Sequence, residues 1–88
     1  MLGDLYNKYS NQELSNLSLS SYKIARIDTS DANFSYFGFV DRAGAWHILR
    51  EDATISDDKN YKYCFGQGEF ATAWSDRVTQ LYDYLDKV

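Results

Sequence analysis

Four short runs rich in aromatic and β-branched residues follow one another between residues 22 and 65, and they constrain the fold more than any other feature. The runs are YKIARID at 22–28, FSYFGFV at 34–40, AWHILRE at 45–51 and YKYCF at 61–65. Stretches rich in Asp, Asn, Ser or Gly, which favour turns, separate each run from the next. The pattern predicts an antiparallel meander of about four strands.

The connection between the second and third runs carries a specific turn sequence, D-R-A-G at 41–44. The carboxylate of Asp41 can accept hydrogen bonds from backbone amides further along the turn, and Gly44 can adopt the left-handed conformation that closes a hairpin of three to five residues. These two residues therefore predict a β-hairpin around 41–44.

The tail after Gly68 follows a different period. Residues 69–88 contain neither Gly nor Pro, and their apolar side chains recur every three or four positions, at Phe70, Trp74, Val78, Leu81, Leu85 and Val88. This spacing predicts an amphipathic helix that covers one face of the sheet. The stretch LYDYL at 81–85 could instead extend as a strand. We expect an α+β fold, with residues 22–88 as a single compact domain.

Residues 1–21 precede this domain and are expected to form an N-terminal arm or linker. The first nine residues place apolar side chains at helical spacing, at Leu2, Leu5, Tyr6 and Tyr9. The next twelve, SNQELSNLSLSS, are mostly polar. They favour a linker, and a short helix around Leu14 and Leu17 is the alternative, because Ser10 and Glu13 fit a helix capping box.

The predicted sheet carries aromatic side chains on both faces. Alternation along 34–40 places Tyr36 and Val40 on one face and Phe37 and Phe39 on the other. A sheet with one wet face would alternate apolar and polar residues. Either the N-terminal arm covers the second face or another chain does, and the arm is short for this task. We therefore expect a protein interface formed by Phe37, Phe39, Tyr61, Tyr63, Leu2, Leu5 and Tyr6.

Candidate catalytic and metal-binding residues are few. His47 is the only histidine and has Asp41, Glu51 and Asp52 nearby in sequence, whereas Cys64 is the only cysteine and could neighbour His47 across two strands. A lone strand histidine is more often a surface or packing residue, and an isolated cysteine is more often a small apolar filler. One His and one Cys do not make a usual zinc ligand set, and no phosphate-binding glycine loop is present. We expect no enzyme, cofactor, metal site or small-molecule substrate.

The balance of nine basic and thirteen acidic residues gives a net charge of −4. Sequence-independent nucleic-acid binding is carried by Lys and Arg, so nucleic acid is not the expected partner. The N-terminus lacks the pattern of a signal peptide, and no apolar run reaches the ~20 residues of a membrane span. The expectation is a soluble protein inside a cell or in a particle assembled there, with no membrane partner.

The order of three motifs resembles a pattern in small uncharacterised proteins of tailed bacteriophages. The motifs are V-D-x-x-G-x-W at 40–46, Y-x-Y-x-x-G at 61–66 and A-W-x-x-R at 73–77. The resemblance implies a phage origin and carries over no catalytic residue. Within it, we expect a virion component such as a decoration, connector or tail-associated subunit, bound to itself or to other virion proteins. The alternative is a small acidic inhibitor that binds a host defence or nucleic-acid enzyme in the host cytoplasm.

Overall fold

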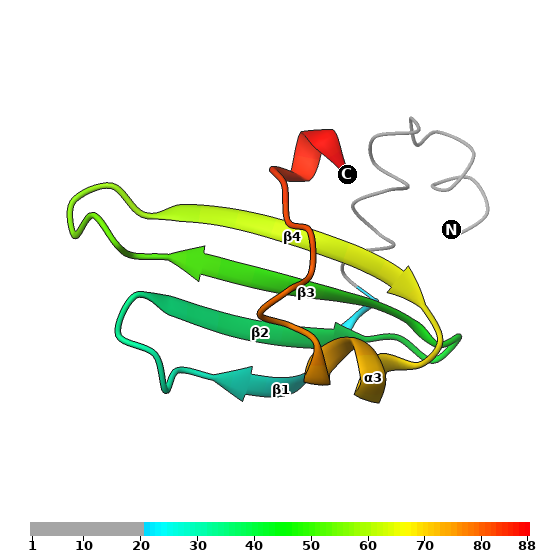
Figure 1. The fold of residues 1–88 in the computed structure, drawn as a ribbon. Coiled ribbons are helices and arrows are strands. Elements are labelled where there is room, and N and C mark those ends of the chain that lie inside the picture. The colour runs from blue at the N-terminus through cyan, green and yellow to red at the C-terminus, as the bar shows by residue number, and fades with distance from the viewer. Residues whose placement is uncertain (1–20) are drawn as a thin grey trace, which may run out of the picture.

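The strands form one antiparallel sheet in which spatial order follows chain order, β1-β2-β3-β4 (Figure 1). The computed structural model describes residues 21–88. The strands are β1 (Lys23–Asp28), β2 (Phe34–Val40), β3 (Ala45–Asp52) and β4 (Asn60–Gln67). All three neighbouring pairs are antiparallel, and a register shift interrupts the β1–β2 pair between Ile24 and Arg26. The predicted four-stranded meander is confirmed.

The turns between strands are closed by aspartate side chains. Asp41 Oδ1 accepts hydrogen bonds from the backbone amides of Ala43 and Ala45, at 2.9 and 3.0 Å. Gly44 has a φ of 92°, the left-handed conformation expected of it. The carboxylates of Asp28, Asp31 and Asp52 each accept a similar hydrogen bond, from the backbone amide of the residue two positions later. The turn chemistry in the sequence thus explains where the first three strands end.

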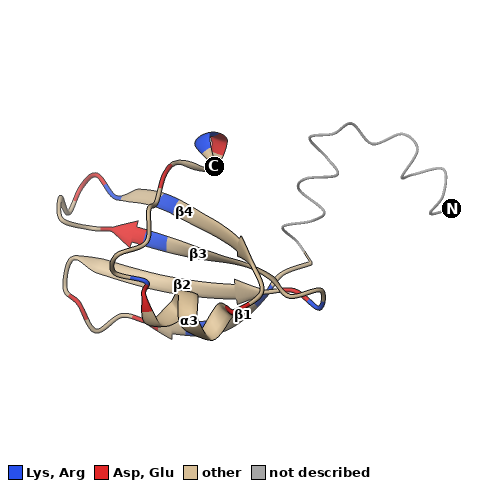
Figure 2. Ribbon diagram, turned by 45° about the vertical axis from the view of Figure 1, so that its right-hand side comes forward, with Lys and Arg blue, Asp and Glu red and all other residues tan. Residues whose placement is uncertain are grey.

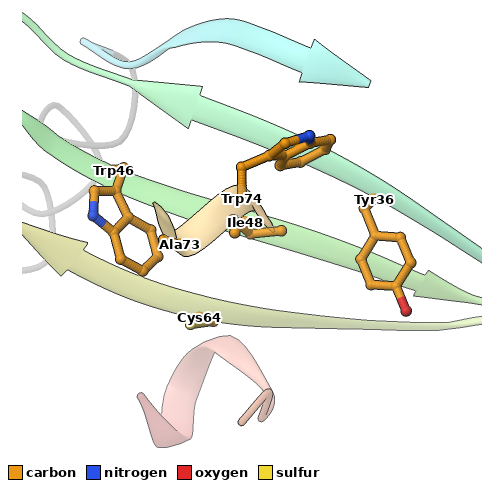
Figure 3. Close-up of a cluster of buried hydrophobic side chains, with 6 residues drawn as sticks. All are labelled: Tyr36, Trp46, Ile48, Cys64, Ala73 and Trp74. Carbon is orange, nitrogen blue, oxygen red and sulfur yellow. The ribbon is translucent and has the colours of Figure 1, made fainter. Parts of the chain in front are cut away.

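The hydrophobic core lies on one face of the sheet, beneath the short helix α3 (Phe70–Ser75) and the segment that follows it (Figures 1 and 3). Ile48, at the centre of β3, is fully buried. The buried apolar residues around it are Tyr36, Trp46, Cys64, Ala73 and Trp74. Successive side chains of a strand point to opposite faces, so these residues belong to one face of the sheet, which α3 and the tail cover. The described elements after β4 do not pack on the other face.

The C-terminal tail contradicts the predicted twenty-residue helix. Only α3 is α-helical, and a 3₁₀ turn, η1 (Leu85–Lys87), follows after an irregular segment. Phe70 and Trp74 pack on the sheet as predicted, but the remaining apolar positions, Val78, Leu81, Leu85 and Val88, are exposed, Leu81 by 90%. The described fold is dominated by its sheet and is α+β only in the coarse sense that one short helix packs on it.

Polar contacts of Arg77 explain why the helix ends early. The Arg77 guanidinium donates to the Asp28 carboxylate at 2.8 and 3.0 Å, linking the tail to the end of β1. Its charged group also lies 4.8 Å from the ring centre of Trp74. The Tyr82 hydroxyl donates to the Arg77 backbone carbonyl at 2.7 Å. These contacts fix the turn that follows α3.

Beyond this turn the tail crosses the core face in an extended conformation. The Tyr82 ring packs against the core and lies 4.8 Å below the Arg50 guanidinium. Asp83 then forms a two-way backbone bridge with Tyr63 of β4, with N–O distances of 2.7 and 3.1 Å. The stretch LYDYL at 81–85 does not form the strand that was the alternative to a helix, because only Asp83 pairs with the sheet and Leu85 begins η1.

Gly66 provides a stability prediction for this core. A Cβ atom at residue 66 would collide with the indole ring of Trp46, and that ring is fixed because its Nε1 donates to the Gly68 carbonyl at 2.7 Å. We expect Gly66→Ala to lower the free energy of unfolding by about 1–3 kcal/mol, the range for overpacking. Urea denaturation measures the loss. Thr72→Ala, at an exposed helix position, is the control, and an equal change in both variants would contradict the predicted collision.

Candidate interaction surface

The sheet face opposite α3 is lined by aromatic and aliphatic side chains from every strand. Paired residues in adjacent strands point to the same side, so the register defines this set. We call its apolar and aromatic part the aromatic face, which comprises Ile24, Ile27, Phe37, Phe39, His47, Leu49, Tyr61, Tyr63 and Phe65, together with the ring of Tyr22 just before β1. The same register places Ser35 and Glu51 at one end of this side of the sheet, where the Tyr61 hydroxyl donates to the Glu51 carboxylate at 3.0 Å.

His47 lies at the centre of the aromatic face. Its ring is stacked against Phe39 and Tyr22, with centroids 4.6 Å away in each case. Phe65 and Tyr63 flank it at 5.2 and 6.0 Å. The residue is only 6% exposed, and this burial lowers the pKa of His47 to about 4 because an imidazolium would lose its hydration. His47 is therefore neutral near pH 7.

Around this buried histidine, large apolar side chains remain exposed to solvent. Ile27 on β1 is 59% exposed and Phe65 on β4 is 38% exposed. Ile24 and Tyr61 are also exposed. The exposed side chains thus extend from one edge strand to the other rather than standing singly. Contiguous apolar surface of this kind marks interaction sites more often than isolated exposed residues do.

The predicted interface residues fall into two groups. Phe37, Phe39, Tyr61 and Tyr63 all lie on the aromatic face, brought together from β2 and β4 by the intervening strand β3. The remaining predicted residues, Leu2, Leu5 and Tyr6, lie outside the described residues.

Sequence reasoning omitted several members of the face, above all His47, Phe65 and Tyr22. Strand alternation could have found Phe65, which stands two positions after Tyr63, and the register places His47 directly between Phe39 and Phe65. Alternation also places Tyr22 on the side of Ile24, two positions later, but only the structure shows that its ring stacks on His47. The face is therefore more aromatic at its centre than predicted.

The considered pairing of His47 with Cys64 is wrong. The two strands do neighbour each other, but His47 is opposite Phe65 whereas Cys64 is opposite Ile48. Alternation sends the imidazole to the aromatic face and the thiol into the core. Burial raises the pKa of the Cys64 thiol, the reverse of what nucleophile activation requires.

Charged side chains are found mainly in the loops and near the strand ends (Figure 2). Several of the carboxylates have local structural roles. Asp28 accepts hydrogen bonds from Ser30 and Arg77, which lower its pKa to about 2. Asp52 is held in the same way by Thr54. Asp28 and Asp52 thus have a local role in closing turns.

Comparison with known proteins found no match to this chain among protein-family models, curated proteins or solved structures. Within residues 21–88, no group of three or more His, Cys, Asp or Glu side chains is placed to hold a metal ion. The same part of the chain contains no helix that is long and apolar enough to cross a membrane.

Proposed function

We propose that this protein is a non-enzymatic structural or assembly subunit that joins copies of itself through the aromatic face. The observation that carries the proposal is the set of apolar side chains on this face, which are exposed on both edge strands, as at Ile27 and Phe65, and half-buried on the strands between, as at Phe37. Tyr, Phe and Trp dominate the energetics of stable protein interfaces because each buries a large apolar area. Covering this face would remove that area from water.

The size of the face favours an assembly with several contacts over an isolated dimer. Four strands spaced by about 4.8 Å and about seven residues long at about 3.4 Å per residue cover roughly 19 by 24 Å. A flat patch of roughly 450 Å² lies below the ~800 Å² per partner of a standard interface. Such a contact gains strength when many copies are held together in one particle.

The resemblance to small tailed-bacteriophage proteins supports a particle of this kind. A decoration, connector or tail-associated subunit is repeated many times, so that modest contacts add up. We therefore propose a phage virion as the site of assembly. The test is mass spectrometry of virions purified from the phage that encodes this chain, and its absence from them would contradict the virion role while leaving self-association open.

Charge substitutions on the aromatic face should prevent self-association. We expect the double variant Ile24→Lys/Phe65→Lys to stay monomeric at concentrations where the wild-type protein forms a defined oligomer, because two ammonium groups would have to be desolvated in the contact. Light scattering after size-exclusion chromatography measures the mass.

The control is Val78→Lys/Leu81→Lys, which adds the same charge at exposed apolar positions away from the aromatic face. This variant should assemble as the wild type does. A wild-type protein that is monomeric at all concentrations, or a control variant that also fails to assemble, would contradict the proposed use of the aromatic face.

A further inference from the structure

We infer that the bridge between Asp83 and Tyr63 is an autoinhibitory contact, which keeps the outer edge of β4 from pairing with β4 of a second copy. The two β4 strands would lie antiparallel about a two-fold axis at Tyr63 and join the four-stranded sheets of both copies into one. This pairing does not depend on the proposed function, and only its consequence for assembly rests on it.

The first observation is that β4 is a regular edge strand closed by the tail at one residue. Its register with β3 runs without a shift along the whole strand. The Tyr63 amide donates to the Asp83 carbonyl at 2.7 Å and the Asp83 amide donates to the Tyr63 carbonyl at 3.1 Å, so both backbone groups of Tyr63 point away from β3. Alternation points the backbone groups of Tyr61 and Phe65 outward as well. Within residues 21–88, the tail forms no bridge to these two residues.

The opposite edge of the sheet is protected in a different way. The register of β1 shifts between Ile24 and Arg26, and Lys23 and Arg26 carry positive charge along this strand. Irregular register and charged side chains are usual means by which an edge strand avoids pairing with another chain. By contrast, β4 has no register shift and Lys62 is its one charged residue. At β4, the contact with the tail takes this protective role.

The second observation is that the sequence of β4 is complementary to itself about Tyr63. Antiparallel pairing centred on Tyr63 places Tyr61 opposite Phe65 of the second copy, and Phe65 opposite its Tyr61. All three residues lie on the aromatic face, and aromatic pairs across neighbouring strands stabilise a sheet. Lys62 would lie opposite Cys64 of the second copy, so no like charges meet. A second copy of β4 is therefore a strand that fits this edge.

The third observation is that the tail occupies the place of this partner strand. Figure 1 shows the chain after α3 crossing the sheet and continuing past β4, so that η1 lies beyond the edge. Two contacts hold it beside the bridge. The Tyr84 hydroxyl donates to the Asn60 side chain at 3.2 Å, and the Lys62 ammonium lies 5.0 Å from the Tyr84 ring centre. A second β4 can pair only after this segment has left the edge.

The tail has an advantage over a second copy because it belongs to the same chain. A segment joined by a short link has an effective concentration on the order of millimolar, so the edge stays closed at ordinary protein concentrations. When the tail is displaced, the two-fold axis sets both aromatic faces on the same side of the joined sheet. The patch of roughly 450 Å² would become roughly 900 Å², which exceeds the ~800 Å² per partner of a standard interface. Edge pairing would thus strengthen the proposed assembly through the aromatic face.

The variant Asp83→Pro tests the autoinhibitory contact, because proline has no amide to donate to Tyr63. It is combined with Ile24→Lys/Ile27→Lys, which adds charge to the aromatic face at two exposed β1 positions and leaves β4 unchanged. We expect this protein to dimerise at a concentration at least about tenfold lower than the same background with Asp83, because the competing closed state has been removed. Asp83→Asn in that background keeps the backbone bridge and is the matched control. Light scattering after size-exclusion chromatography measures the mass.

Overhauser contacts between labelled and unlabelled copies identify the edge that pairs. In the dimer, the Tyr61 ring should contact the Phe65 ring of the second copy. A proline variant that folds and stays monomeric, equal dimerisation of the proline and asparagine variants, or a dimer without these contacts would overturn the inference.

A second variant decides the matter if Asp83→Pro does not fold. Tyr84→Ala removes the two contacts beside the bridge and leaves the buried core residues unchanged. In the same charged background it should form the same dimer at a lower concentration than its parent, and an unchanged midpoint would overturn the inference. Association of the wild type through the aromatic face is measured separately, so its absence contradicts the proposed function while these dimers still decide the role of the bridge.

Discussion

Replacing Trp74 by alanine should lower the free energy of unfolding by about 3–5 kcal/mol, the usual cost of deleting a buried aromatic side chain. The Trp74 ring is 4% exposed and is the main contact of α3 with the sheet. It lies directly over Gly38, where a Cβ atom would be 2.9 Å from the ring. The guanidinium groups of Arg26 and Arg77 lie against the same ring system, at 5.6 and 4.8 Å from its centre. The variant would lose the contact of α3 with the sheet and the contacts of both guanidinium groups with the ring.

Urea denaturation of the Trp74→Ala variant measures this loss against a total stability of about 5–15 kcal/mol for a domain of ordinary stability. Trp46→Ala, on the same face, should give a loss in the same range because Trp46 is also buried. Leu81→Ala is the control, since Leu81 is 90% exposed and its truncation should change stability by less than about 0.5 kcal/mol. A loss below about 1 kcal/mol for both tryptophans would mean that the packing around α3 is wrong.

Stability should fall in mild acid because of His47. Burial lowers the pKa of His47 to about 4 in the folded protein, whereas an unfolded histidine has a pKa near 6.5. Above about pH 6.5 the residue is neutral in both states and the fold keeps its full stability. Between about pH 6.5 and 4 only the unfolded chain takes up the proton. Stability should therefore decrease by on the order of 2–3 kcal/mol over this window.

Urea denaturation between pH 7 and pH 4.5 measures this dependence, and His47→Leu is the comparison. The leucine variant should keep nearly constant stability over the same window, since it has no proton to bind at this position. Asp28 also has a lowered pKa, about 2, so its contribution is present above the unfolded pKa near 4 and is lost only at lower pH. Parallel pH curves for wild type and variant would contradict the burial of His47.

The sheet could be predicted from the sequence because its determinants are local. Asp41 and Gly44 specify the central hairpin, and alternation along each strand specifies which side chains share a face. Alternation places Phe37 and Phe39 on the face of the sheet that does not carry Tyr36, so a second apolar face can be predicted without any long-range contact. The buried centre of that face could not be predicted in this way, because it depends on the strand register, which places His47 between Phe39 and Phe65.

The tail could not be predicted because its determinants are long-range. The spacing of Phe70, Trp74, Val78 and Leu81 suits a helix, but the salt bridge from Arg77 to Asp28 joins residues 49 positions apart. The bridge of Asp83 to Tyr63 also depends on the finished sheet. Periodicity alone carries no information on such contacts, so it predicts a helix that is too long by more than three turns.

The central claim is that copies of this chain join through the aromatic face, and concentration-dependent NMR of the wild-type protein tests it most directly. Raising the concentration through the assembly midpoint should shift or broaden the signals of Ile24, Ile27 and Phe65, while those of Val78 and Leu81 on the exposed tail stay constant. Spectra that do not change with concentration, or changes confined to the tail, would contradict the claim.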